Sequence, residues 1–97
     1  MAYTLGKLIQ QLESEIPLFT QESWDNSGLQ LGDKTTVIHR VLLALDASSD
    51  VIDEAIALDA QAIVTHHPII FKGMKAMTAS DFIGKRLLTA AKHGIAL

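Results

Sequence analysis

Two short apolar runs separated by a helical pattern constrain the fold of this chain more than any other feature. Residues 41–45 (VLLAL) and 62–65 (AIVT) have the length and character of buried strands. Between them, apolar residues recur at helical spacing: Val51, Ile52, Ala55, Ile56 and Ala60. Ser48, Ser49 or Asp50 can cap this helix. The pattern predicts a right-handed βαβ unit with parallel strands, in which strand 41–45 is buried on both faces.

Further elements are predicted on both sides of this unit. A helix begins after Thr4 and ends before Pro17, with the apolar stripe Leu5, Leu8, Ile9, Leu12 and Ile16. Residues 29–31 alternate and indicate a short strand or extended segment, and loops are expected at 24–28 and 72–75. A later helix starts at Ser80 or Asp81, and its broad apolar side holds Phe82, Ile83, Leu87, Leu88 and Ala91. Gly94 ends that helix, and residues 95–97 open a third parallel strand.

Composition limits the class of protein. The 97 residues are 48% hydrophobic and 20% charged, which indicates one globular domain. The alternation of strand and helix patterns predicts that this domain is of α/β class. A net charge of −3 and scattered basic residues argue against nucleic-acid binding. The chain has no cysteine, no apolar run of membrane-spanning length and no signal-peptide pattern at its start. A cytoplasmic location is therefore expected.

The segment most suited to chemistry is His66-His67-Pro68, directly after the second apolar run. Imidazole is the commonest metal ligand among side chains, and open α/β sheets bind ligands at the carboxyl ends of their strands. Asp46 closes the first run, so parallel pairing would set it beside the two histidines. Adjacent strand residues point to opposite faces. We therefore expect either a turn at Pro68 or a separate metal ion for each histidine.

Several of these residues have a second interpretation. His66 and His67 could simply end the strand and hydrogen-bond to neighbours, and Asp46 could cap the following helix, bind metal or orient a ligand. His39 is expected at the surface, and His93 in the last turn of a helix, where a cation favours the helix dipole. The cluster Trp24-Asp25-Asn26 is typical of a packed tryptophan beside a turn.

Three linked motifs resemble one known family. They are residues 24–32 (WDNSGLQLG), 43–46 (LALD) and 65–73 (THHPIIFKG). In this order and spacing they are similar to the Nif-three-like family, whose members are also catalogued as homologues of a type 2 GTP cyclohydrolase I. The resemblance extends over nearly the whole chain. It implies a three-layer α/β/α fold with a mostly parallel sheet, of which residues 1–97 would be the N-terminal part of a single domain.

The resemblance also implies a dinuclear metal site. His66 and His67 would be its first ligands, one to each of two divalent ions such as zinc, iron or manganese. The family's remaining ligands, an aspartate after the third strand and a histidine and a glutamate near the C-terminus, have no counterpart in this sequence. The chain is expected to be truncated before them, with an incomplete sheet. Such a fragment would bind metal weakly and would be inactive.

Two functions follow as expectations from the resemblance. The first is a metal-dependent hydrolase acting on a small nucleotide or phosphoester, assembled as a toroidal homohexamer. The second is a non-catalytic metal-binding or protein-interaction module. No catalytic residue beyond the metal ligands is predicted in this chain.

Overall fold

A parallel β-sheet forms the centre of the computed structural model, which describes residues 2–15, 28–70, 74 and 76–97. Strand β1 (Val41–Ala44) pairs in parallel with β2 (Ala62–Thr65), and Val41 lies opposite Ala62. Ala96 forms a parallel bridge to Ala62, so β2 lies between β1 and the last residues of the chain. The predicted parallel strands and the beginning of a third one are confirmed.

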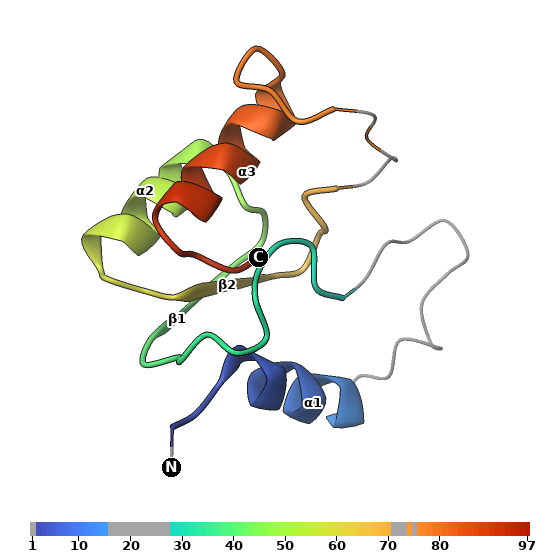
Figure 1. Ribbon diagram of the computed structural model, residues 1–97, viewed down its shortest axis with the longest axis vertical. Coiled ribbons are helices and arrows are strands. Elements are labelled where there is room, and N and C mark those ends of the chain that lie inside the picture. The colour runs from blue at the N-terminus through green and yellow to red at the C-terminus, as the bar shows by residue number, and fades with distance from the viewer. Residues whose placement is uncertain (1, 16–27, 71–73, 75) are drawn as a thin grey trace.

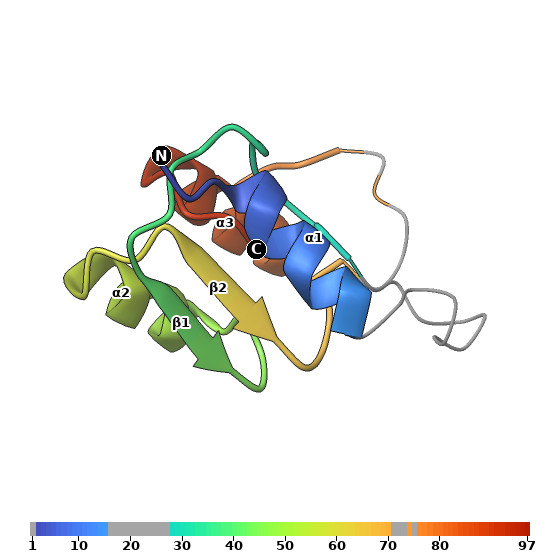
Figure 2. The same ribbon diagram turned by 90° about the horizontal axis from the view of Figure 1, so that it is seen from below.

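Helices cover both faces of this sheet and give three layers (Figures 1 and 2). Helix α2 (Ser49–Ala57) and helix α3 (Phe82–Lys92) lie on one face, and helix α1 (Leu5–Glu15) lies on the other. Successive side chains of β2 point to opposite faces of the sheet. Ile63 packs in the core under α2 and α3, whereas Ala62 packs in the core under α1. The α/β/α architecture expected from the sequence is therefore present.

Helix boundaries are set by the polar residues that the sequence indicated. The Ser48 hydroxyl accepts a hydrogen bond from Val51 N at 3.2 Å, and an Asp81 carboxylate oxygen accepts one from Gly84 N at 3.3 Å. The Thr4 hydroxyl accepts from Lys7 N at 3.3 Å. Such caps satisfy amides that have no partner within the helix. Gly94 follows α3 with a φ of +67°, the left-handed conformation that glycine adopts at little cost.

Helix α1 is tied to the rest of the molecule at its first turn. Leu5 N donates to Thr36 O at 2.7 Å, and Gly6 N donates to Lys34 O at 2.8 Å. The turn that supplies these carbonyls is shaped by Asp33, whose Oδ1 accepts from the hydroxyl and the backbone N–H of Thr35. These two hydrogen bonds, the hydroxyl one first, lower the pKa of the Asp33 carboxyl.

The prediction that strand 41–45 is buried on both faces is wrong. Leu43 is 74% exposed and Leu45, just beyond the strand, is 62% exposed. An apolar run shows that a strand can be buried, but burial also needs a layer over each face. Helix α1 covers Val41 and leaves the carboxyl-terminal half of β1 uncovered on its side of the sheet (Figure 2).

The predicted apolar side of the last helix is also partly wrong. Phe82 is 72% exposed and Leu88 is 38% exposed, and Ala91 is exposed as well. The buried residues of α3 are instead Gly84, Leu87 and Ala90, which recur at three-residue spacing. The broad apolar side allowed more than one rotation of the helix, and Gly84 faces the Thr78 backbone, where a side chain would not fit.

Residues 29–31 form an extended segment and not a strand. Gln30 N and Leu31 N both donate to Leu97 O, and Leu97 N donates back to Leu31 O at 2.8 Å. The predictions for Ile16, Pro17, residues 24–27 and residues 71–73 and 75 lie outside the described residues. Among the helices that are described, none is long and apolar enough to cross a membrane.

Candidate metal site at the carboxyl ends of the strands

The two parallel strands end at the same edge of the sheet, and the backbone pairing continues one step beyond them. His66 N donates to Ala44 O at 3.3 Å, and His67 N donates to Leu45 O at 3.1 Å. These bonds hold both histidines beside the end of β1, although β2 has ended at Thr65. The position is the one where ligands bind in open α/β sheets.

The predicted meeting of Asp46 with the histidines is confirmed. His67 Nδ1 lies 2.8 Å from Asp46 Oδ1, and each side chain is 57% exposed. A carboxylate can only accept a hydrogen bond, so the proton of a neutral His67 ring is placed on Nδ1. The lone pair of Nε2 is then left for another partner. Carboxylates often orient metal-binding histidines in this way.

The two histidine rings lie on the same side of the chain. Their centroids are 4.8 Å apart and the rings meet edge to face at 63°. Strict alternation would have separated them, but the chain bends immediately after β2, at residues 66–67, and the Thr65 hydroxyl donates to His67 O at 2.6 Å. The turn that the sequence placed at Pro68 therefore begins before it. This geometry is compatible with one metal ion bound by both histidines and with a separate metal ion for each histidine.

The other two histidines do not join this cluster. His39 precedes β1, and its backbone N–H donates to the Gln61 side chain at the opposite edge of the sheet. His93 ends α3, where its Nδ1 lies 3.0 Å from Thr89 O. Within the described ranges, no group of three or more His, Cys, Asp or Glu side chains is placed to hold a metal ion.

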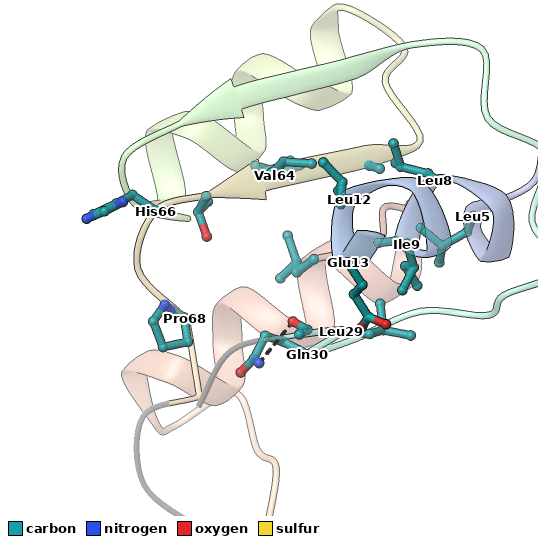
Figure 3. Close-up of a pocket in the computed structure, with 16 residues that line it drawn as sticks. Leu5, Leu8, Ile9, Leu12, Glu13, Leu29, Gln30, Val64, His66 and Pro68 are labelled. Carbon is teal, nitrogen blue, oxygen red and sulfur yellow. Dashed lines mark hydrogen bonds between the residues drawn. The ribbon is translucent and has the colours of Figure 1, made fainter. Parts of the chain in front are cut away.

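A pocket of about 310 Å³ lies beside the histidines on the α1 face of the sheet (Figure 3). Leu8, Leu12 and Val64 line its apolar wall, and Pro68 borders it. Figure 3 shows the His66 ring directed away from this pocket. His66 is nevertheless one of the residues that line the pocket, so the imidazole cluster adjoins the apolar pocket at the end of β2.

Gln30 hydrogen-bonds to the segment that follows the two histidines, a role that the sequence pattern did not reveal. Its Oε1 accepts from Ile70 N at 3.2 Å and its Nε2 donates to Gly28 O at 3.2 Å. The side chain therefore connects the extended segment at 28–31 to the segment that follows the histidines. The only signal in the sequence is a polar residue between two leucines, which strand alternation explains equally well.

The three linked sequence motifs agree with a comparison to protein families. A model of the family described as Duf34/NIF3 (NGG1p interacting factor 3) matches residues 3–97. The chain belongs to the Duf34/NIF3 family. Curated relatives carry the name "GTP cyclohydrolase 1 type 2 homolog"; one from Clostridium perfringens is 36% identical over 93 residues, and one from Staphylococcus aureus is 40% identical over 78 residues. The chain spans 36% and 21% of these two relatives.

Solved structures of Duf34/NIF3 relatives have the same arrangement of elements. A Staphylococcus aureus protein is 36% identical with a TM-score of 0.93, and 99% of this chain covers 27% of that protein. A Bacillus cereus protein described as related to NIF3 is 35% identical with a TM-score of 0.91, and the match covers 99% of this chain and 26% of that one. Reduced HcgD from Methanocaldococcus jannaschii is 28% identical with a TM-score of 0.88, over 100% and 39% of the two chains.

Proposed function

We propose that this chain supplies the first two ligands of a site for two divalent metal ions, and that a complete Duf34/NIF3 protein uses the site for metal-dependent hydrolysis. The observation that carries the proposal is the His67 Nδ1 to Asp46 Oδ1 hydrogen bond of 2.8 Å beside the exposed His66 ring. The name carried by the relatives suggests a nucleotide or another phosphoester as the substrate.

The donor set fits a divalent transition metal in type but not in number. Neutral imidazole nitrogen is a good ligand for zinc and iron, and Asp46 favours the tautomer of His67 in which Nε2 is available. Zinc ordinarily takes about four ligands, however. We infer that His66 and His67 bind metal weakly by themselves and that further ligands complete the site in longer family members.

The roles of the chain's own residues follow from this geometry. His66 and His67 would hold the ions at the end of β2, and Asp46 would fix the orientation of the His67 ring. Bound ions would lower the pKa of a coordinated water and polarise a substrate oxygen. Hydrogen bonds to β1 and Leu45 fix the backbone of both histidines, and Asp46 holds the His67 ring.

Calorimetric titration of the tag-free chain with Zn²⁺ or Mn²⁺ tests the proposal. The chain has four histidines, which divide into two matched pairs. We expect weak binding that is lost in the His66→Ala, His67→Ala double variant. The same binding should persist in the His39→Ala, His93→Ala double variant, because those side chains lie at the other edge of the sheet. Binding that survives loss of the first pair would overturn the site.

Asp46→Asn provides a finer test of the orienting role. The amide can still hydrogen-bond but is a poorer acceptor for the His67 N–H, so metal affinity should fall about 10- to 100-fold. Asp53→Asn is the control, because this exposed residue of α2 carries the same charge outside the cluster. Equal affinities of the two variants would contradict the role of Asp46.

Hydrolysis itself is tested on a full-length relative. GTP and simple phosphoesters are incubated with the enzyme in the presence of manganese, zinc or iron, and product is measured for the wild type and for the variant that lacks both motif histidines. Turnover that depends on these histidines supports the hydrolase. Metal binding without turnover on any substrate favours the second function, a non-catalytic metal-binding or interaction module.

A further inference from the structure

The loop that carries Asp46 is tied to helix α3 by an arginine. Arg86 Nη1 donates to Ala47 O at 2.9 Å, and Ala47 directly follows Asp46. The two bonded residues are 39 positions apart, so the contact joins α3 to the loop between β1 and α2. Residues 45–46 form a bend, and Ser48 caps α2. The arginine therefore binds the short stretch that connects the bend to the cap.

The next residue of α3 supports the same loop by packing. Leu87 is 1% exposed and forms one buried cluster with Ala47 and Ile69. Ala47 follows Asp46 by one residue, and Ile69 follows His67 by two. Leu87 thus packs with neighbours of both partners of the Asp46–His67 hydrogen bond, and Arg86 adds a directional contact to one of them.

The guanidinium of Arg86 is itself held in place. It stacks on the Phe82 ring, with Cζ at 4.5 Å from the ring centroid. Phe82 is 72% exposed, and this stacking gives the exposed ring a partner one helical turn away. Within the described part of the chain, Ala47 O is the acceptor that the guanidinium reaches. A planar guanidinium stacked on a ring directs its N–H groups along fixed lines.

We propose that Arg86 is a positioning residue for the candidate metal site. By holding Ala47 O, it keeps Asp46 within reach of His67 Nδ1, which leaves His67 Nε2 available to a metal ion. The Asp46–His67 bond of 2.8 Å tolerates little movement, because such bonds span only about 2.7–3.2 Å. The effect on metal rests on the proposed function, whereas the effect on the Asp46–His67 contact does not.

The position of the proton on His67 tests this role without metal. At about pH 8, where free histidine is neutral, ¹⁵N chemical shifts distinguish the Nδ1–H tautomer from the Nε2–H tautomer that predominates in the free amino acid. In the wild type the Asp46 carboxylate should make Nδ1–H the main form. We expect Arg86→Met to shift His67 toward the Nε2–H form.

Methionine is chosen so that the variant stays folded. It keeps an aliphatic stem that packs as the arginine stem does. It also removes Arg86 Nε, which is buried and has no hydrogen-bond partner among the described residues. Arg86→Lys is a second variant that keeps the charge and an N–H donor, so its tautomer shift should be smaller. A larger shift for lysine than for methionine would contradict the proposal.

Arg40 provides a matched control in the same chain. Its Nη1 donates to Leu58 O, so it binds a carbonyl at the end of α2 as Arg86 binds one before its start. Arg40→Met removes the same charge and the same kind of hydrogen bond, and it should leave the His67 tautomer unchanged. Equal shifts in the two variants, or no shift in a folded Arg86→Met variant, would overturn the proposal.

Metal affinity is the second measurement. Titration with Zn²⁺, followed by the same histidine signals, should show an affinity up to about tenfold lower for Arg86→Met than for Arg40→Met. Loss of a positive charge by itself favours a cation, so net charge cannot explain a lower affinity. In the Asp46→Asn background, Arg86→Met should have little further effect, because the arginine acts through Asp46. Additive losses would contradict this route.

The two measurements separate this inference from the proposed function. A tautomer shift in Arg86→Met, in a chain that binds no Zn²⁺ even as the wild type, would support the positioning role and overturn the metal site. Zn²⁺ binding that depends on His66 and His67, together with an unshifted tautomer, would support the metal site and overturn the role of Arg86.

Discussion

The two faces of the sheet differ in how completely this chain covers them. On the α2 and α3 face, Ile52 and Leu87 are 1% exposed and Ala55 is fully buried. On the α1 face, Leu12 is 37% exposed, Leu43 is 74% exposed, and a pocket of about 310 Å³ separates helix from strand. The α2 and α3 face is therefore closed, whereas the α1 face has a buried cluster around Leu5 and retains exposed apolar surface beyond it.

The two faces also differ in how far their helices pack against the sheet. Helices α2 and α3 approach the sheet and each other over Ala55 and Ala90, both fully buried. On the other face α1 contacts the sheet mainly near its first turn, around Leu5. Close packing along a whole helix requires matched surfaces on both partners, and α1 has a matched partner at one end only.

The largest expected effect comes from truncating a leucine on each face. Leu87→Ala removes a buried side chain and should lower the free energy of unfolding by about 2–5 kcal/mol. Leu12→Ala removes a partly exposed one and should cost about 1 kcal/mol. Urea unfolding followed by circular dichroism measures both. Equal losses would show that the two faces are closed to the same degree.

A smaller effect is expected from adding a methyl group to a glycine in each layer. Alanine normally favours a helix by up to about 1 kcal/mol over glycine. At Gly84, however, a Cβ would overlap the backbone oxygen of Thr78 and lie 2.9 Å from its nitrogen. Gly84→Ala should therefore destabilise the protein by about 1–3 kcal/mol.

Gly6→Ala is the matched substitution in α1. Its Cβ would lie 3.2 Å from Lys34 O, a contact that a small shift can relieve. We expect a change within about 0.5 kcal/mol, measured by the same unfolding experiment. A loss at Gly6 as large as the loss at Gly84 would indicate that α1 is packed as tightly as α3.

The smallest expected effect concerns acid. The folded-state pKa of Asp33 is lowered by Thr35, so its stabilising contribution is present above the unfolded value of about 3.9 and is lost as pH falls through the folded value. Asp33→Asn removes this titration. The wild type should melt at a higher temperature than the variant at pH 6. Below pH 3 the two melting temperatures should become equal. If the difference in melting temperature between wild type and variant were the same at both pH values, the ionised form of Asp33 could not be its cause.

The sequence predicted the order and pairing of the helices and strands better than it predicted which side chains are exposed. The βαβ unit and its caps follow from local spacing, and the meeting of Asp46 with His67 follows from parallel pairing. The exposure of Leu43 could not be predicted, because it depends on where α1 lies and not on the strand itself. The rotation of α3 also depends on tertiary contact, since Phe82 and Leu87 are equally apolar in the sequence.

The candidate site was likewise predictable in the position of its residues but not in the arrangement of their side chains. The sequence placed His66 and His67 at the end of a strand, but alternation alone would have separated their rings. The bend at residues 66–67, held by hydrogen bonds to Leu45 O and from the Thr65 hydroxyl, brings them to 4.8 Å. Whether these rings bind metal stays a prediction.

The hydrogen bonds at the first turn of α1 also bear on the order in which the chain folds. They join Leu5 and Gly6 to carbonyls at residues 34 and 36, which closes a loop of about 30 residues. The β1–α2–β2 unit, in contrast, is continuous from residue 41 to residue 65 and forms from nearby segments. We expect amide protection to arise first in this unit during refolding and later in α1, because docking of the helix needs its distant partner already in place.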